Sequence, residues 1–310
     1  MRARAGAWLA PETGEAVAHP ALMARAAAAG VVLLGETHDR ADHHRWQLSV
    51  LAGLAAHRAD LVVGFEMFPA RADPVLAEWV SGGLSEAAFL ERAEWGQVWG
   101  FAAALYLPLF HFCRLHGVPM VGLNCDRDLV RKVGAGGWEA VPEAAREGIT
   151  PAAPATEAYR RYLFDMTGGR REGRAAQQPM DPAFDRFVRA QQVWDQAFAC
   201  RIAAARANSG VGSKRRAVLD SCARQNTQAS APEGPGAIGG GKLDSSVSQP
   251  GAPLVAGIIG RGHLEYRGGT PHQLADLGIP DALVLLPVDA GGEIAPGIAD
   301  AVFGLAPPSE

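Results

Sequence analysis

Short apolar runs alternate with longer segments of helical periodicity along most of the chain. Five runs have the length and aliphatic, β-branched composition of buried strands: residues 31–34, 61–65, 119–123, 254–259 and 282–287. Helical patterns separate them, most clearly at 42–58, at 105–115 and from 184 toward 206. Near-continuous apolar strands separated by helices are typical of a parallel sheet covered on both faces. The pattern predicts an α/β fold with a mostly parallel central sheet, helices on both faces and a ligand crevice at the C-terminal strand ends.

Residues 208–251 interrupt this alternation. Ser, Gly, Gln and Pro dominate the segment, and it has few aliphatic residues and no hydrophobic period. Such a composition cannot bury enough apolar surface to offset the entropy of folding. We therefore expect a single domain over residues 1–310 with a disordered Ser/Gly-rich insertion at 208–251. Two further glycine-rich stretches, 134–137 and 168–179, are predicted to be loops.

Composition narrows the class of protein. The 310 residues are 48% hydrophobic and 20% charged, with a formal net charge of −4, which is typical of a globular protein and does not favour nucleic acid as a partner. Four widely spaced cysteines without a C-x-x-C pair predict free thiols in a reducing compartment. The sequence has no apolar leader, no cysteine placed for lipid attachment and no stretch long enough to span a bilayer. As written, we expect a cytoplasmic protein, or a cell-envelope protein if the true start lies upstream.

Polar side chains suited to ligand binding or proton transfer follow four of the predicted strands. They are Glu36 and His38 after the first strand, Glu66 after the second, Asn124 after the third, and His263 with Tyr266 after the fourth. Because the carboxyl ends of parallel strands lie at one edge of a sheet, we expect these side chains to line a common crevice. Each also has a structural interpretation; Glu36, for example, suits the start of a helix. A glutamate directly after a buried strand nevertheless needs a partner such as His38 or His263.

The remaining histidines have less specific patterns. His43 and His44 open the first helix one turn before Gln47, so they either line the mouth of the crevice or cap the helix. Of the others, His111 and His116 are predicted to be structural, His19 and His57 to lie at the surface, and His272 to cap a helix.

Several familiar catalytic and nucleotide-binding motifs are absent from the sequence. The G-R-G-H run at 260–263 is not a dinucleotide fingerprint, because Glu265 stands where the third glycine is required. The phosphate-binding loop G-x-x-x-x-G-K-[ST], the serine-hydrolase motif G-x-S-x-G and the zinc motif H-E-x-x-H do not occur.

Five motifs in order resemble the ChaN-like haem-binding uptake proteins, a group in the superfamily that includes the Tiki proteases and resembles the erythromycin esterases. They are G-E-T-H-D at 35–39 with H-H-R-W-Q at 43–47; F-E-M-F at 65–68; Trp95, Trp99 and Tyr106 with G-L-N at 122–124; Q-V-W-D at 192–195; and G-R-G-H at 260–263 through G-T-P at 269–271. Order and spacing agree over roughly residues 7–290.

The resemblance implies an α/β fold, haem binding in some members and a role in iron acquisition. It also implies that Glu36, His38, Glu66 and His263 are the clustered polar residues of the family. The chain departs from the family in two respects. Many relatives are exported lipoproteins, whereas this sequence has no export signal, and the insertion at 208–251 is not part of the family pattern.

The first functional hypothesis is a haem binder or carrier. Its cofactor contacts would be His38, His44, Glu66, Asn124, His263 and Tyr266, with Tyr266 and the three histidines as candidate axial ligands. Trp95, Trp99 and Tyr106 supply aromatic walls for a flat macrocycle. The absence of C-x-x-C-H makes any haem non-covalent, and the haem is expected in the crevice or between the subunits of a homodimer.

The second hypothesis is a hydrolase. Glu36, His38, Glu66 and His263 form a mixed nitrogen and oxygen set suited to Mn, Fe, Co or Zn, which would activate a water molecule. Without a metal, His38 would serve as the general base, oriented by Glu36 or Glu66. A third hypothesis is a scaffold that keeps the fold without the chemistry.

Overall fold

The structure is a computed structural model that describes residues 1–208 and 251–306. The predicted insertion at 208–251 falls outside the described residues except at its two end positions, and the single domain over 1–310 stays a prediction. The three cysteines in the described residues, Cys113, Cys125 and Cys200, form no disulfide. No helix within these two ranges is both long enough and apolar enough to cross a bilayer.

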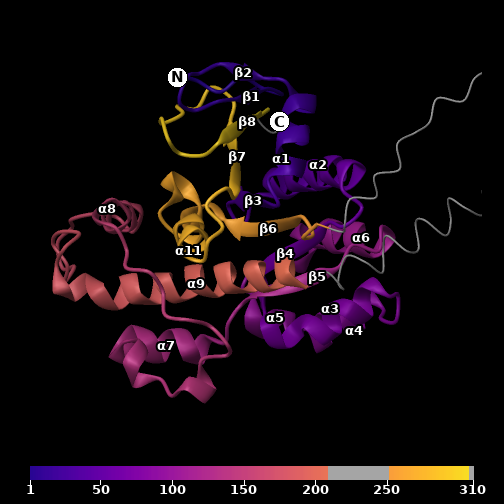
Figure 1. Ribbon diagram of the computed structural model, residues 1–310. Coiled ribbons are helices and arrows are strands. Elements are labelled where there is room, and N and C mark those ends of the chain that lie inside the picture. The colour runs from indigo at the N-terminus through magenta and orange to yellow at the C-terminus, as the bar shows by residue number, and fades with distance from the viewer. Residues whose placement is uncertain (209–250, 307–310) are drawn as a thin grey trace, which may run out of the picture.

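Eight strands form one sheet in the order β2-β1-β8-β7-β3-β6-β4-β5 (Figure 1). The strands are β1 (Trp8–Leu9), β2 (Ala16–Val17), β3 (Val31–Glu36), β4 (Val62–Pro69), β5 (Met120–Asn124), β6 (Val255–Gly260), β7 (Leu283–Asp289) and β8 (Ala301–Leu305). The six strands from β8 to β5 pair in parallel, and β1 pairs antiparallel with both β8 and β2. The predicted α/β class with a mostly parallel sheet is therefore confirmed.

Two strands extend further than their apolar runs predict. β3 continues to Glu36 because its parallel pairing with β6 runs on to the pair Glu36–Gly260. β4 continues through Glu66 to Pro69. Glu36 and Glu66 are therefore strand residues and do not follow their strands, which explains why both are buried. The sequence pattern also missed β1 and β2, of two residues each, and the five-residue β8.

Helices cover both faces of the sheet. The helices are α1 (His19–Ala28), α2 (Ala41–His57), α3 (Asp73–Val80), α4 (Glu86–Arg92), α5 (Trp95–Val98), α6 (Leu107–Leu115), α7 (Arg127–Gly136), α8 (Glu157–Met166), α9 (Asp185–Ala207) and α11 (Thr270–Asp276). The short 3-10 helices are η1 (Ala70–Ala72), η2 (Ala103–Leu105), η3 (Trp138–Ala140), η4 (Glu143–Ala145), η5 (Pro182–Phe184), η6 (Arg261–His263) and η7 (Glu265–Arg267).

Alternate residues of the central strands supply the two halves of the core. Val32 and Leu34 of β3 pack in one cluster with residues of α1, α2, α3 and α6. Val31 and Leu33 pack in the other with residues of α7, α9 and α11. This period of two is expected for a strand buried on both faces. In Figure 1, α9 accordingly lies along the second face, between α7 and α11.

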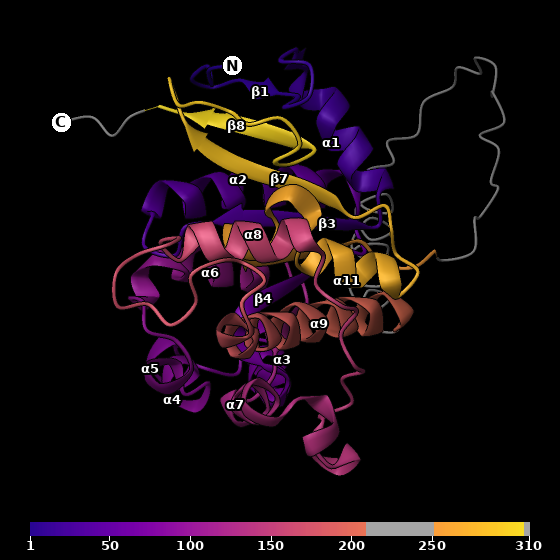
Figure 2. The same cartoon turned by 90° about the vertical axis from the view of Figure 1, so that its left-hand side faces the viewer.

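A third, smaller cluster holds α8 against the start of α9. It contains Tyr159, Leu163 and Phe164 of α8 with Ala176, Phe184 and Val188. Figure 2 shows α8 in front of the sheet, with the 167–180 segment looping away from its end. That segment is a loop as predicted. The predicted loop at 134–137 is wrong, because α7 extends to Gly136 while Leu129, Val130 and Val133 bury its apolar side.

Gly122 in β5 lies in close contact with the backbone of the neighbouring strand β4. A Cβ atom at this position would lie 2.6 Å from the Pro69 oxygen and 2.7 Å from the Phe68 oxygen. Because these are backbone atoms that cannot rotate away, we expect Gly122→Ala to lower the free energy of unfolding by about 1–3 kcal/mol. Urea unfolding measures the change. Gly96→Ala, where no atom lies within 4 Å of the new methyl group, is the control and should leave stability equal or slightly higher. Equal losses in the two variants would contradict the prediction.

Candidate functional site

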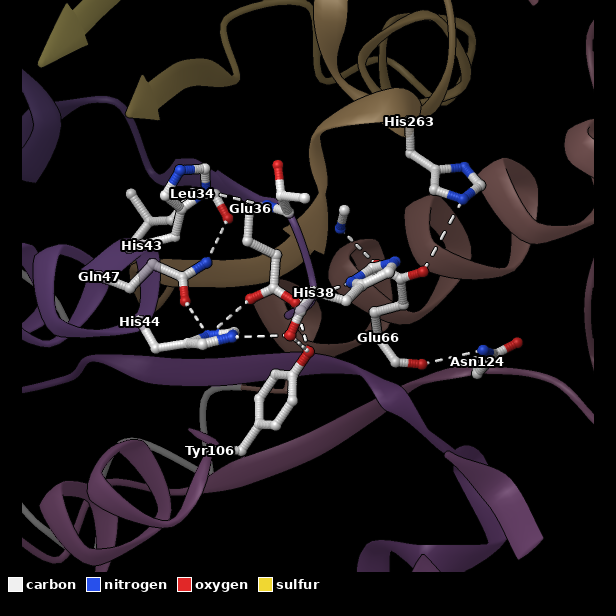
Figure 3. Close-up of polar contacts among 12 residues, drawn as sticks. Leu34, Glu36, His38, His43, His44, Gln47, Glu66, Tyr106, Asn124 and His263 are labelled. Atoms are coloured by element: carbon white, nitrogen blue, oxygen red, sulfur yellow. Dashed lines mark hydrogen bonds and ion pairs between the residues drawn. The ribbon is translucent and has the colours of Figure 1, made fainter. Parts of the chain in front are cut away.

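Polar residues at the carboxyl ends of the parallel strands form one cluster (Figure 3). Glu36 ends β3, Glu66 lies inside β4, and His263 ends η6, which follows β6 directly. Glu36 Oε1 lies 2.9 Å from His38 Nδ1, and Glu66 Oε1 lies 3.8 Å from His263 Nε2. The structure therefore brings together four of the six side chains that the sequence places at strand ends.

Glu36 is the centre of this cluster and is only 2% exposed. Its Oε1 accepts hydrogen bonds from Tyr106, at 2.7 Å, and from His38, while its Oε2 lies 3.1 Å from His44 Nδ1. Burial raises the pKa of the Glu36 carboxyl, but hydrogen bonds and charges from His38 and His44 outweigh burial and lower the pKa to about 2. Glu36 is therefore a carboxylate at neutral pH.

His44 is the buried cation that balances Glu36. Its Nδ1 faces Glu36 and the Gln47 oxygen, at 3.2 Å, and its Nε2 lies 3.1 Å from the His38 carbonyl oxygen. Because every one of these partners is an acceptor, both ring nitrogens carry protons. Burial lowers the pKa of His44, but the contacts with Glu36 raise it further, so the net shift is upward. Both ring nitrogens of His44, one of the haem ligands that the sequence suggests, are therefore engaged with protein acceptors.

Gly260 provides the space in which His38 and Glu66 approach each other. A Cβ atom on Gly260 would lie 2.6 Å from His38 Cε1 and 3.3 Å from Glu66 Oε2, and the Gly260 N–H donates to that oxygen. The His38 ring is flanked by Trp99 and Phe101, with ring centres 4.9 and 5.1 Å away. Burial lowers the pKa of His38. The hydrogen bond to Glu36 and the negative charges of Glu66 and Glu36 raise it by more, so the net shift is upward. His38 is thus held between two carboxylates.

Asp195 on α9 holds His263 from behind. Asp195 is fully buried, and its Oδ1 lies 2.9 Å from His263 Nδ1. Tyr159 donates to Oδ2 at 2.7 Å and Thr270 donates to Oδ1 at 3.1 Å. These contacts fix the proton on His263 Nδ1 and turn Nε2 toward Glu66.

Asn124 has a structural role in this geometry. The pairing of β4 with β5 is irregular between Phe65 and Pro69, and the Asn124 amide donates to the Glu66 carbonyl oxygen at 2.9 Å within that stretch. The Asn124 side-chain oxygen accepts the N–H of Cys125. Asn124 also lines a separate pocket of about 340 Å³ with Arg71. Its amide is therefore engaged with backbone and does not point into the Glu36 cluster.

Tyr266 lies in a different place from the buried cluster. It is 46% exposed and lines a pocket of about 690 Å³ beside α8. Tyr159, Tyr162 and Met166 also line this pocket, and the Tyr266 and Tyr162 rings meet edge to face at 5.6 Å. The turn at 260–268 thus has the Glu36 cluster near its start and this pocket near its end.

The sequence placed Asp195 in a family motif but did not indicate its role in the site, and the hydroxyl partners of the buried acids were missed. Tyr159 binds Asp195, and Tyr162 donates to Glu265 at 2.8 Å. One signal for Asp195 was present, since it shares a helical stripe with Phe198 and Ile202, both fully buried. An acid on such a stripe needs a buried partner.

The other histidines are engaged with protein groups or exposed. His43 is buried, and its Nδ1 accepts the N–H of Thr37. Burial and the nearby Arg40 lower the pKa of His43 to about 4, so it is neutral and neither caps α2 nor lines a crevice. His111 contacts Glu86, His272 lies within α11 and contacts the Pro154 carbonyl oxygen, and His19, His57 and His116 are exposed.

The predicted metal set does not have the geometry of a metal site. Among residues 1–208 and 251–306, no group of three or more His, Cys, Asp or Glu residues is arranged to hold a metal ion. The cause is local, since Glu36 holds His38 Nδ1, Asp195 holds His263 Nδ1, and one Glu66 oxygen takes the Gly260 N–H. The side chains satisfy one another as acid–imidazole pairs.

Comparison with known proteins identifies a family and a solved structure of similar fold. The family model for haem-binding uptake, Tiki superfamily, ChaN, matches residues 22–219. ChaN of Campylobacter jejuni, solved with cofacial haem binding, is 16% identical, has a TM-score of 0.64, and aligns over 96% of this chain and 95% of its own. At that identity the similarity shows a shared fold. No curated protein matches the chain in sequence.

Two further solved structures are more distant. RRSP, a MARTX toxin effector domain from Vibrio vulnificus, has a TM-score of 0.38 at 11% identity, covering 88% of this chain and 36% of its own. The erythromycin esterase EreC has a TM-score of 0.39 at 13% identity, covering 90% of this chain and 76% of its own. Neither similarity is strong enough to carry a functional argument.

The Asp195–His263 pair predicts a specific pH dependence of stability. Burial lowers the pKa of His263, but Asp195 and Glu66 raise it to about 9 in the folded protein, against about 6.5 in an unfolded chain. A raised pKa adds stability that is fully present below the unfolded value and is lost as the pH rises through the folded value. The stability difference between wild type and His263→Gln should therefore shrink by up to about 3 kcal/mol between about pH 6 and pH 10. Urea unfolding across this range measures it.

His57→Gln is the matched control, because His57 is exposed. Its stability relative to wild type should change little over the same range. A His263→Gln difference that stays constant with pH would contradict the assignment of His263 as a paired cation.

Proposed function

Since the chain belongs to the ChaN family of haem-binding uptake proteins in the Tiki superfamily, we propose that it binds haem non-covalently and acts in haem or iron uptake. The cofacial haem binding described for Campylobacter ChaN, which shares the fold, supports this proposal. The sequence has no C-x-x-C-H motif for covalent attachment.

The observation that carries the proposal is the free phenol of Tyr266. Of the four tyrosines, Tyr106, Tyr159 and Tyr162 donate their hydroxyls to Glu36, Asp195 and Glu265. The Tyr266 hydroxyl has no hydrogen-bond partner among the described residues, and the side chain is half-exposed over the pocket. A tyrosine phenolate is an established ligand of haem iron. We therefore assign Tyr266 as the axial ligand.

The pocket around Tyr266 fits a haem group in chemistry and size. Its aromatic and thioether walls suit a flat apolar ring, and about 690 Å³ is within the usual range for small-molecule sites. Bound haem would supply an iron that accepts the phenolate oxygen. His38, Glu66 and His263 remain proposed contacts near the start of the same turn. The exposed side chain of Met166 at the pocket suits cover by a second copy of the chain, as in a homodimer.

Haemin titration tests the proposal. We expect wild type to give a saturable, red-shifted Soret band, and Tyr266→Phe to lose the tyrosinate spectrum and to bind haemin about tenfold more weakly, a change of about 1.4 kcal/mol. Tyr162→Phe is the matched control, because it lines the same pocket but uses its hydroxyl on Glu265. An unchanged spectrum and affinity in Tyr266→Phe would reject Tyr266 as the ligand. A featureless wild-type titration would reject haem binding.

A second candidate function, hydrolysis by a general base, is favoured by one observation. His263 is held by a fully buried Asp195 so that Nε2 faces Glu66. An acid–imidazole pair of this kind orients a histidine to take a proton from an attacking water or hydroxyl. Because Asp195 and Glu66 raise the pKa of His263 to about 9, its Nε2 would be free to take that proton only near or above this pH. Glu36 and His38 form a second such pair. The Asp195–His263 pair supports the metal-free form of the hydrolase hypothesis.

Turnover of ester and amide model substrates tests this second candidate. If the pair is catalytic, Asp195→Asn should lower kcat by about 10²- to 10⁴-fold while circular dichroism stays native. His57→Gln, at an exposed histidine outside the cluster, should keep full activity. Equal activity in wild type and Asp195→Asn, or no turnover by wild type, would remove this candidate.

A further inference from the structure

The backbone that carries Tyr266 is unusual. Tyr266 has φ of 55° and the next residue, Arg267, has φ of 58°. Side chains other than glycine rarely adopt this left-handed region, because Cβ crowds the backbone. Two consecutive residues in it persist only where their surroundings fix them, and such strain gathers at functional sites.

The surroundings that fix this turn are contacts of Arg267. Its Nη1 donates to the Ala282 carbonyl oxygen at 3.0 Å and to Asp300 Oδ2 at 2.9 Å, and its Nη2 donates to the Pro280 carbonyl oxygen at 3.0 Å. The Tyr266 N–H donates to the Ile298 carbonyl oxygen at 3.1 Å. The turn is thus tied to the segments before β7 and before β8.

Asp300 is itself anchored to the sheet. Its Oδ2 accepts the N–H of Val284 at 2.8 Å, and its own N–H donates to the Val284 carbonyl oxygen at 3.0 Å. Val284 belongs to β7, which pairs with the central strand β3. The other Asp300 oxygen, Oδ1, contacts Arg25 at 3.2 Å. Asp300 therefore connects Arg267 to a rigid element.

On its other side the turn packs against α8. A Cβ atom on Gly268 would lie 2.5 Å from the ring of Tyr159, and one on Gly269 would lie 2.4 Å from the His263 carbonyl oxygen. The chain after Arg267 therefore has no room to shift toward the pocket. Because Gly268 is packed against Tyr159, the turn is held on that side by α8 and on the other side by the contacts of Arg267. The contacts of Arg267 therefore set the direction of the Tyr266 side chain.

We propose that Arg267, anchored on Asp300, is a positioning residue that holds Tyr266 in its left-handed conformation and so presents the phenol to the haem pocket. Arg267 acts through the backbone and does not touch the ligand. Without its guanidinium, the two residues relax to negative φ and the phenol leaves its place over the pocket. The identity of the ligand rests on the proposed function, whereas the orientation of Tyr266 does not.

The test compares Arg267→Gln with Arg25→Gln. The two variants each remove one arginine from Asp300, but only Arg267 adjoins Tyr266. In the protein without haem, hydrogen exchange of the Tyr266 amide should become at least about tenfold faster in Arg267→Gln and stay unchanged in Arg25→Gln. With haemin, Arg267→Gln should lose about tenfold in affinity and most of the tyrosinate spectrum. Arg267→Lys, which keeps a donor for Asp300, should restore part of both.

The outcomes separate the two claims. If Arg267→Gln leaves exchange and haemin spectrum at wild-type values, the positioning role is wrong, and the haem proposal stands or falls with Tyr266→Phe alone. If Arg267→Gln speeds exchange but Tyr266→Phe leaves the haemin spectrum unchanged, the positioning of Tyr266 is right and its assignment as ligand is wrong. If Arg267→Gln does not fold, the same two measurements are made on Arg267→Lys. Amide exchange of Tyr266 and a haemin spectrum that both equal those of the wild type in Arg267→Lys would overturn the proposal.

Discussion

The negative charge of Glu36 at the carboxyl end of the central strand β3 is the constraint that organises the site. A carboxylate withdrawn from water is costly unless opposite charge and hydrogen bonds surround it. His38, His44 and Tyr106 supply them, and they come from the turn after β3, from α2 and from the residue before α6. The carboxylate has all three contacts only when these three segments are in place together. The same contacts leave no free nitrogen on His44 and fix the Nδ1 side of His38.

Asp195 repeats this arrangement on the other side of the cluster. It is fully buried, holds His263 and is completed by the hydroxyls of Tyr159 and Thr270. Two buried acids thus each fix an imidazole, and in both cases a tyrosine completes the pair. The phenol of Tyr266 differs from these two tyrosines, because it is half-exposed and has no acidic partner among the described residues. The site therefore contains a buried part, whose side chains contact one another, and an exposed part at Tyr266. The turn that starts at Gly260 joins the two parts.

The parts of the fold and site that the sequence predicted are those set by local pattern. The central strands were identified because they are buried on both faces and read as unbroken apolar runs, and the clustering of Glu36, Glu66 and His263 followed from parallel strands sharing one edge. The two-residue strands β1 and β2 are too short for any period. The two-sided engagement of His44 depends on how the turn between β3 and α2 folds back, because its partners all lie within residues 36–47. The left-handed turn at Tyr266 depends on contacts with residues 280–300, which no local pattern encodes.

The positions of the two described ends at Asn208 and Gly251 have a consequence for changes to the chain. α9 ends at Ala207 and β6 begins at Val255, and both points lie near the amino ends of the strands. Arg206 lies beside Gly30, directly before β3, and Arg58 holds the Ala252 carbonyl oxygen. The polar cluster and the Tyr266 pocket are at the opposite, carboxyl edge. The two described ends that flank this part of the sequence therefore lie at the edge of the sheet away from the site, and a reporter joined between them would be attached at that edge.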